Sequence, residues 1–417
     1  MLNLNKESVL LIEKEEKKLS SIFDKINELE MINSKKVLDA FHKNNLSESD
    51  LIGTTGYGYN DIGRDKIESI YSDIFKCEDA LVRREFVSGS HALSISLSAL
   101  LRPGDNFLII SGKTYDTLDE VIGIKPNPSS LKSYNINYKI IDLIDNDFDY
   151  ETIKKSLTDI KLVYIQRSRG YSLRESLTIE KVEKVIKLVK SINKDIIIFV
   201  DNCYCEFVES TSVTEVGADI MVGSLIKNLG AGLCTHGAYV CGKKDLIRLV
   251  SERLYLPGEA KEVGPSIDAN RMFLMGLFFA PSVVSSSLKS AILISKVMDT
   301  LGYRVSPKWD QNRCDIVNIV YLKNEENLIN FTKLIQASGP VDASVVPIPS
   351  DMPGYTDKVI MASPSFTQGS SIEMSCDAPL RSPYALYIQG GLTYSYAKLA
   401  LINVISNLKL TTSVSFF

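Results

Sequence analysis

The chain has 417 residues, of which 45% are hydrophobic and 24% are charged, and its formal net charge is −4. This apolar content supports a large buried core and excludes an intrinsically disordered chain, while the slight acidity argues against a nucleic-acid partner. Seven scattered cysteines without a CxxC pair predict reduced thiols rather than a disulfide framework or a zinc site. The carboxylates and the three histidines are also too dispersed to predict a metal site.

Residues 1–52 are expected to form an N-terminal helical arm. Apolar residues recur at spacings of three and four between residues 5 and 45, among many lysines and glutamates. The same charges interrupt residues 1–19, so we predict no signal peptide. Apolar runs such as Ile196–Val200 are far shorter than the roughly 18 residues that span a bilayer. These features predict a soluble, cytoplasmic protein with no membrane contact.

A glycine-dense segment, Gly53–Arg64, follows the arm. It is either a linker or a binding loop. Its two tyrosines and its arginine favour a binding loop, because linkers consist mostly of serine, proline and small polar residues.

Helical and strand-like patterns alternate from about residue 65 to residue 240. The predicted helices are Ala92–Leu101 and Thr178–Ile192, and the predicted strands are Asn106–Ser111, Lys161–Ile165, Ile196–Asp201 and Ile220–Gly223. Such alternation indicates a mostly parallel sheet covered by helices. Residues 265–301 are expected to be helical and to complete a large α/β domain over residues 53–300.

Residues 301–417 alternate again, in shorter pieces. We predict a strand at Ile316–Leu322 and helices at Glu325–Ala337 and Tyr394–Leu408. The sequence therefore predicts a second, smaller α/β domain at the C-terminal end of the chain.

Two residues that could carry chemistry follow predicted strands. Asp201 ends the strand Ile196–Val200, and Lys227 follows the strand Ile220–Gly223. Ligands of open α/β sheets sit beyond the carboxyl ends of the strands, so both side chains would point into one crevice. The lysine amine there could form a Schiff base with a carbonyl compound. Alone, Lys227 could be a surface lysine and Asp201 a helix N-cap, but the pair favours a functional site.

Small residues at Ser88–Ser90 precede the predicted helix at Ala92. The N-terminus of a helix exposes backbone N–H groups that can bind an anion such as phosphate. The alternative is a serine N-cap without a ligand.

Taken together, these segments resemble the fold-type I pyridoxal 5′-phosphate (PLP) enzymes of cysteine and methionine metabolism, which include methionine γ-lyase and the cystathionine lyases. The closer resemblance is to a bacterial family known as aluminium resistance proteins or methionine γ-lyase family proteins. The matching segments are Gly56–Asp65, Ser88–His91, Arg102–Asp105, Gly112–Gly123, Val200–Asn202, Ser224–Asn228 and Gln389–Tyr394.

The resemblance implies a role for each matching residue. Lys227 is similar to the lysine that holds PLP as a Schiff base and moves the Cα proton, and Asp201 to the carboxylate that pairs with the pyridine nitrogen. Gly89, Ser90 and Ser224 match the groups that bind the phosphate. Tyr115 matches the aromatic residue that stacks on the cofactor ring and assists the leaving group; it could also be a half-buried tyrosine at a strand end.

The glycine-rich loop resembles a segment that enters the neighbouring subunit's site. Tyr57 matches a tyrosine that contacts the phosphate, but Tyr59 stands where the family has an arginine, and Arg64 could replace it only if the loop folds differently. The resemblance implies a homo-oligomer, a dimer or a homotetramer, with shared active sites.

The sequence leaves the roles of three further positions open. His91 could face the cofactor or be a packing residue, and Arg381 could clamp a substrate carboxylate or lie on the surface. The segment Gln166–Gly170 follows a strand and suggests another cofactor-side loop. Cys203 and Cys205 are expected to be small buried residues.

The resemblance implies a PLP-dependent carbon–sulfur lyase (EC 4.4.1 class) that acts on a sulfur-containing amino acid, as methionine γ-lyase or a cystathionine lyase does. Whether the β or the γ bond breaks is not specified by the motifs. The alternatives are another PLP reaction on an amino acid, such as transamination, and a PLP-binding stress-response protein with little turnover.

Overall fold

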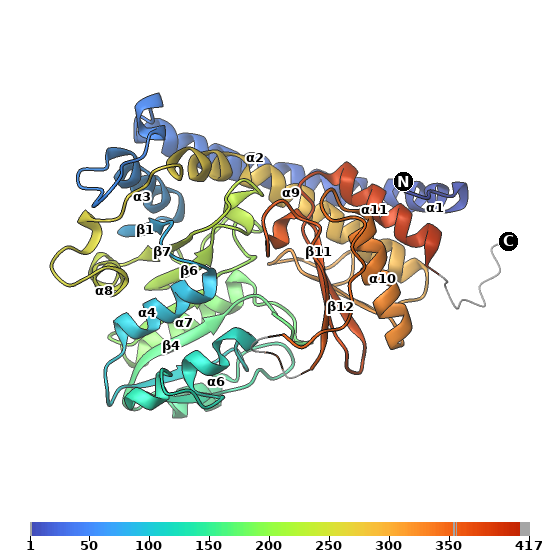
Figure 1. Cartoon of the computed structure of the whole chain (residues 1–417). Helices are drawn as coiled ribbons and strands as arrows, with labels where there is room; N and C mark the ends of the chain where they lie inside the picture. The colour runs from blue at the N-terminus through green and yellow to red at the C-terminus, as the bar shows by residue number, and fades with distance from the viewer. Residues whose placement is uncertain (1, 353–354, 356, 409–417) are drawn as a thin grey trace. The chain divides into compact units, whose positions relative to one another are not determined.

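The computed structural model describes residues 2–352, 355 and 357–408 (Figure 1). The chain divides into two compact units. The large unit comprises residues 28–284 and 313–316, and the small unit comprises residues 1–27, 285–312 and 317–417. This division differs from the predicted boundaries at residues 52 and 300, because α2 (Ser20–Lys43) and α9 (Asn270–Thr300) each supply residues to both units.

The large unit is built on a seven-stranded sheet with the order β1-β7-β6-β5-β4-β2-β3. Neighbouring strands from β6 to β3 run parallel, whereas β7 is antiparallel to both β6 and β1. The strands are β1 (Asp79–Arg83), β2 (Asn106–Ile109), β3 (Asn137–Ile140), β4 (Ile160–Gln166), β5 (Ile197–Asp201), β6 (Ile220–Ser224) and β7 (Ala238–Gly242). The predicted α/β class with a mostly parallel sheet is confirmed.

Helices cover this sheet, as the continuous burial of its central strands requires. Every residue of β5, β6 and β7 is buried. On one face, α4 and α8 pack together and share an apolar core with the strands. Helix α3 packs on β1 and β7 outside that core, where Tyr71 and Phe75 contact Tyr239. The helices of the large unit, apart from α2 and α9, are α3 (Ile62–Phe75), α4 (Gly89–Leu100), α5 (Asp119–Ile122), α6 (Tyr150–Lys155), α7 (Ile179–Ile192) and α8 (Lys244–Leu254).

The small unit contains a five-stranded sheet with the order β10-β11-β12-β9-β8, antiparallel throughout. Its strands are β8 (Val305–Ser306), β9 (Asn318–Tyr321), β10 (Val359–Ala362), β11 (Ser375–Pro379) and β12 (Ala385–Gln389). Its remaining helices are α1 (Lys6–Lys17), α10 (Glu325–Ser338) and α11 (Tyr394–Asn407). The unit therefore combines strands and helices as predicted, but without parallel pairing.

Helix α9 is long and apolar enough to cross a membrane by length and composition, which the sequence analysis did not anticipate. The stretch of 18 residues in α9 that meets this test is 67% buried inside the protein. A buried core helix of a soluble protein passes the same test, so α9 is weak evidence for a membrane segment.

Candidate active site

Three strands of the large unit end side by side and present polar residues there. Asp201 is the last residue of β5; it pairs with Gln166 at the end of β4 and with Val222 of β6. Ser224 ends β6, and Lys227 lies three residues further on. Parallel strands bring their carboxyl ends to one edge, where ligands of α/β sheets bind. The predicted crevice residues Asp201 and Lys227 therefore share this edge with Ser224.

Asp201 is 5% exposed and is held by two donors. The Cys203 amide donates to Oδ1 at 3.1 Å, and the Tyr164 hydroxyl donates to Oδ2 at 3.4 Å. Burial raises the pKa of the Asp201 carboxyl, while the nearby Lys227 ammonium opposes the rise. A cationic ring nitrogen placed beside this carboxyl would favour its ionised form in the same way.

The Lys227 amine lies over an aromatic ring, with Nζ 3.9 Å from the ring centroid of Tyr204. Burial alone would lower the pKa of Lys227, but the side chains of Cys203, Tyr204 and Asp201 raise it above its ordinary value. The amine is therefore charged at neutral pH when nothing is bonded to it.

The start of α4 approaches the end of β6 closely. A Cβ atom on Gly89 would lie 3.1 Å from the Ser224 Cβ and 3.5 Å from the Cys203 Sγ, so the side-chain-free residue allows this approach. Ser88 caps the helix by accepting from the His91 amide at 3.1 Å. The Ser224 Oγ is buried, and no described residue hydrogen-bonds to it. Helix-start amides and an unpartnered hydroxyl together form a cradle for an anion.

Tyr115 is connected to this edge through β4 and α4. Its amide donates to the Gln166 side chain at 2.7 Å, and Gln166 pairs with Asp201 in the sheet. Two residues beyond Tyr115, the Thr117 hydroxyl lies 2.7 Å from the Ser90 hydroxyl. Gly170 has a positive φ of 56°, and a Cβ atom there would lie 3.2 Å from the Tyr115 ring. Hydrogen bonds and strand pairing thus link the two predicted residues Ser90 and Tyr115 to the residues at the strand ends.

The glycine-rich loop exposes its two tyrosines. Tyr57 is 71% exposed and Tyr59 is 52% exposed, and their rings stack with centroids 5.5 Å apart. Arg64 is buried, and its guanidinium donates to the carbonyl oxygens of Gly58 at 2.8 Å and Gly264 at 2.9 Å. Arg64 therefore holds its own loop against the segment around Gly264, and whether it replaces the missing arginine stays a prediction.

His91 has a structural partner. Its Nδ1 accepts from the Val87 amide at 3.1 Å, and its ring contacts Phe86 edge-on. Burial lowers the pKa of His91, which favours the neutral ring. These contacts agree with the packing interpretation of His91.

Arg381 belongs to the small unit, where its guanidinium donates to the Asp357 carboxylate at 2.7 Å. Its side chain is 52% exposed. Its proposed contact with a substrate carboxylate stays a prediction.

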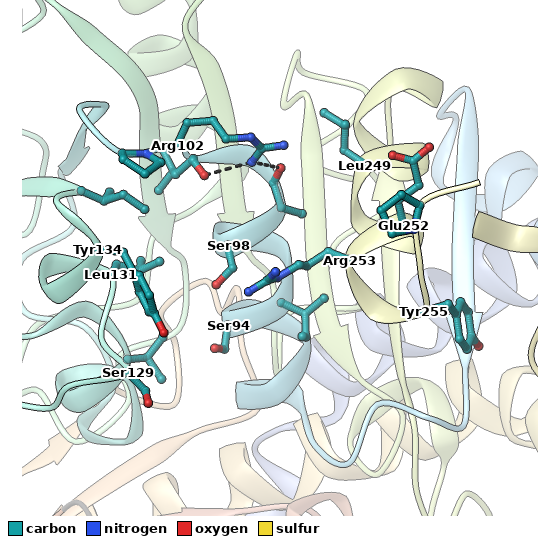
Figure 2. A pocket seen from close by; sticks show the side chains of 17 residues that line it. Ser94, Ser98, Arg102, Ser129, Leu131, Tyr134, Leu249, Glu252, Arg253 and Tyr255 are labelled. Carbon is teal, nitrogen blue, oxygen red and sulfur yellow. Dashed lines mark hydrogen bonds between the residues drawn. The ribbon is translucent and has the colours of Figure 1, made fainter. Parts of the chain in front are cut away.

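A hollow in the large unit lies elsewhere, between α4, α8 and the segment around residue 134 (Figure 2). It encloses about 840 Å³ and is lined by Ser94, Ser98, Arg253 and Tyr134 among others. Arg102 at its rim donates to the carbonyl oxygens of Ala99 and Leu101 at the end of α4. Neither Asp201 nor Lys227 lines it, so this hollow is separate from the strand-end residues.

Residues 8–409 match the model of the family described as methionine gamma-lyase. The chain belongs to the methionine gamma-lyase family. An uncharacterized Bacillus subtilis protein, YnbB, is 44% identical over 394 residues, which cover 94% of both chains.

Solved structures with high sequence identity have the same fold. A Listeria monocytogenes structure, provisionally named as a cystathionine beta-lyase involved in aluminum resistance, is 44% identical with a TM-score of 0.94, covering 96% of this chain and 99% of that chain. A Clostridium novyi structure, named as a carbon-sulfur lyase involved in aluminum resistance, is 43% identical with a TM-score of 0.93, covering 97% and 96% of the two chains.

A more distant structure places the fold among PLP enzymes. The PLP-dependent protein YhfS of Escherichia coli is 17% identical with a TM-score of 0.62, covering 91% of this chain and 97% of that chain. This methionine gamma-lyase family member therefore has the type I fold of PLP-dependent enzymes.

The strand-end residues fit PLP by their chemistry. PLP carries an aldehyde, a ring nitrogen and a phosphate, and the site offers an amine at Lys227, a buried carboxyl at Asp201 and the cradle of Gly89 and Ser224. These are the residues that would hold the cofactor.

Two residues of this region were not singled out by the sequence analysis. Tyr204 holds a left-handed backbone with φ of 73°, and Glu206 is 1% exposed. Their proximity to Asp201 along the chain was the only indication available, because neither belongs to a motif with known chemistry.

Proposed function

We propose that this family member is a PLP-dependent carbon–sulfur lyase acting on a sulfur-containing amino acid, of the methionine γ-lyase or cystathionine lyase kind. The observation that carries the proposal is the arrangement at one sheet edge of an amine, a buried carboxyl and an anion cradle. The names given to the Listeria and Clostridium relatives support the same class of reaction.

Each residue has a defined task in this proposal. Gly89, Ser90 and Ser224 bind the phosphate, and Asp201 keeps the ring nitrogen protonated. PLP, when bound, supplies the electron sink that acidifies the substrate Cα–H bond. Lys227 would hold the cofactor through its amine and would move the proton at the substrate Cα. Tyr115 would contact the cofactor and would assist departure of the thiol.

The test begins with the absorbance spectrum of the purified protein and of Lys227→Ala, recorded as cystathionine, cysteine and methionine are added in turn. We expect borohydride to fix PLP on Lys227, as peptide mapping would show, and thiol and 2-oxo acid to be released from at least one substrate. Lys184→Ala is the matched control, because Lys184 also lies over a tyrosine ring, at 4.0 Å from its centroid. A parent protein that binds no PLP, or binds it at another lysine, would overturn the assignment.

We further propose that the protein acts as a homo-oligomer of at least two chains, in which Tyr57 and Tyr59 reach a neighbouring site. Two stacked aromatic side chains that are more than half exposed are typical of a surface that a partner covers. Sedimentation should give a mass of at least two chains, and Tyr59→Asp should lower it. A monomer that retains full activity would contradict this arrangement.

A further inference from the structure

Tyr204 has a backbone conformation that its side chain disfavours. Its φ of 73° lies in the left-handed region, where a bulky residue without glycine's freedom is strained. The residue follows Asp201 by three positions, and its ring lies under the Lys227 Nζ at 3.9 Å. A strained residue in contact with a chemically active amine suggests a function rather than a packing role.

The loop on both sides of Tyr204 is fixed by hydrogen bonds. Before it, the Asn202 amide donates to the Val222 carbonyl at 2.9 Å, and the Asn202 side chain accepts from Arg167 at 2.9 Å. After it, the Glu206 carbonyl accepts from the Asn228 side chain at 2.9 Å. These contacts explain how the strain persists, because the surrounding structure determines the backbone on either side.

The Asn228 contact also couples the loop to the lysine. Asn228 is the residue after Lys227 and is fully buried. Its hydrogen bond to the Glu206 carbonyl therefore joins the loop that contains Tyr204 to the segment that contains Lys227. The relative position of the Tyr204 ring and the Lys227 amine is thereby defined by the backbone and not only by two mobile side chains.

We propose that Tyr204 is a positioning residue for Lys227, whose ring holds the lysine ammonium in place whenever the amine is not bonded to the cofactor. This inference rests on the proposed function, which requires Lys227 to leave the cofactor and return during each turnover. The lysine side chain has four flexible carbons and would otherwise lose its orientation once released. The face of an aromatic ring attracts an ammonium and holds it near the reacting atoms.

Other groups near Lys227 also affect its charge and must be kept constant in a test. They are Asp201 at the end of β5 and Cys203 and Glu206 in the same loop. Substitutions confined to Tyr204 leave all three in place, so a change in the pKa of Lys227 can be assigned to the Tyr204 side chain, and the Phe variant separates its ring from its hydroxyl.

The experiment compares Tyr204→Phe, which keeps the ring, with Tyr204→Gly and Tyr204→Asn, which remove it and tolerate a positive φ. The first measurement is the pH dependence of Lys227 acetylation in the full-length protein freed of cofactor, followed by peptide mass spectrometry. We expect the Gly and Asn variants to lower the pKa of Lys227 by about one unit. The Phe variant keeps the ring but loses the hydroxyl, whose hydrogen bond also raises this pKa, so it should lower the pKa of Lys227 by less.

The second measurement is kcat and KM of the PLP-loaded proteins. We expect kcat to fall roughly tenfold in the Gly and Asn variants with KM little changed, because the orientation of Lys227 matters after the substrate is bound. Thermal unfolding of these variants should be unchanged or improved, since they relieve the backbone strain. Tyr204→Phe should restore kcat.

The control is Tyr150→Ala, which removes the ring beneath Lys184, and Lys184 is a surface lysine whose acetylation should shift little. An unchanged Lys227 pKa and kcat in both ring-deleting variants would overturn the proposal. A reduced kcat with loss of thermal stability and no pKa change would also overturn it, by indicating a purely structural tyrosine. Borohydride mapping of PLP to another lysine would overturn the proposed function instead, whatever Tyr204 does to Lys227.

Discussion

Two of the groups of polar and charged side chains that the large unit buries differ in how completely their hydrogen bonds are satisfied. The first, which we call the Glu68 cluster, consists of Glu68, Arg83, Lys261 and Asp79. The Arg83 side chain is 1% exposed and that of Glu68 2% exposed. Arg83 Nε donates to Glu68 Oε1 at 2.7 Å, and Lys261 Nζ lies 3.0 Å from Glu68 Oε2.

The rest of the Glu68 cluster is equally well paired. The two remaining guanidinium nitrogens of Arg83 donate to the carbonyl oxygens of Val263 at 2.8 Å and Lys261 at 3.0 Å. Lys261 also pairs with Asp79 at 2.6 Å. Burial lowers the pKa of Arg83, but the charge and hydrogen bond of Glu68, together with Tyr255 and Glu85, outweigh the effect of burial, and the net change is upward.

The second group, which we call the Lys227 cluster, consists of Asp201, Tyr204, Glu206, Ser224 and Lys227. It leaves polar atoms without protein partners: neither the Ser224 Oγ nor the Glu206 Oε2 is hydrogen-bonded to any residue that the structure describes. Its lysine contacts a ring face rather than a carboxylate, and its tyrosine is strained.

The difference separates a structural role from a functional one. Buried polar groups are normally paired, so a fully paired cluster stabilises the fold, whereas unpaired groups at a strand end remain available to a ligand. The comparison predicts that substitutions in the Glu68 cluster reduce stability and those in the Lys227 cluster reduce activity.

The largest effect is expected from Glu68→Gln. It leaves Arg83 buried without its charge partner, whereas Lys261 keeps its ion pair with Asp79. An unpaired buried charge of this kind costs about 3–5 kcal/mol of unfolding free energy. Urea unfolding measures the loss, and activity per folded molecule should stay near that of the parent. Glu183→Gln is the control, because its ion pair with Lys187 is exposed and should contribute at most about 0.5 kcal/mol. Equal losses in the two variants would contradict the structural assignment.

A smaller effect, on activity alone, is expected from Asp201→Asn. The amide keeps the shape of the side chain but cannot hold a cationic ring nitrogen, so kcat should fall roughly 10²–10³-fold. Burial disfavours the ionised carboxyl, so unfolding free energy should be unchanged or slightly higher. Steady-state kinetics and urea unfolding on the same preparations separate the two effects. Destabilisation similar to that of Glu68→Gln, with activity retained, would remove the distinction between the clusters.

The pattern of apolar residues in the sequence predicted where Asp201 and Lys227 lie in the sheet. Apolar runs ending in Asp201 and preceding Lys227 placed both residues at strand ends, and the structure has β5 and β6 there. The short strands β1 and β7 were not predicted, because a few apolar residues between helices carry little periodicity of their own. The arm at residues 5–45 is also divided into α1 and α2, at residues whose composition does not mark a break.

Other features of the site depend on contacts between residues far apart in the chain, which local sequence patterns do not indicate. Arginines are usually exposed, so the burial of Arg64 and its use as a loop brace could not be anticipated. The left-handed backbone of Tyr204 contradicts the preference of its residue type and is imposed by distant partners such as Val222 and Asn228.

The smallest effect is a pH dependence that originates in Glu206. Burial raises the pKa of Glu206 to about 7 from its ordinary 4.5, and the Tyr239 hydroxyl, which donates to Oε1 at 2.7 Å, limits the rise. Because the folded state binds this proton more tightly than the unfolded state, the contribution is fully present below pH 4.5 and is lost as the pH rises toward 7. The difference between the folded and ordinary pKa values of Glu206 corresponds to roughly 3 kcal/mol of unfolding free energy at most.

Glu206→Gln cannot ionise, so it should remove this decline and be more stable than the parent at neutral pH, while both proteins are similar near pH 4.5. Urea unfolding across this range measures the difference, and Glu183→Gln again serves as the control. A decline of the same size in the parent and in Glu206→Gln would mean that Glu206 does not cause it and is ionised in the folded protein over this pH range. Its unpartnered oxygen would then have to be paired with a positive charge such as Lys227, and the Lys227 cluster would resemble the Glu68 cluster after all.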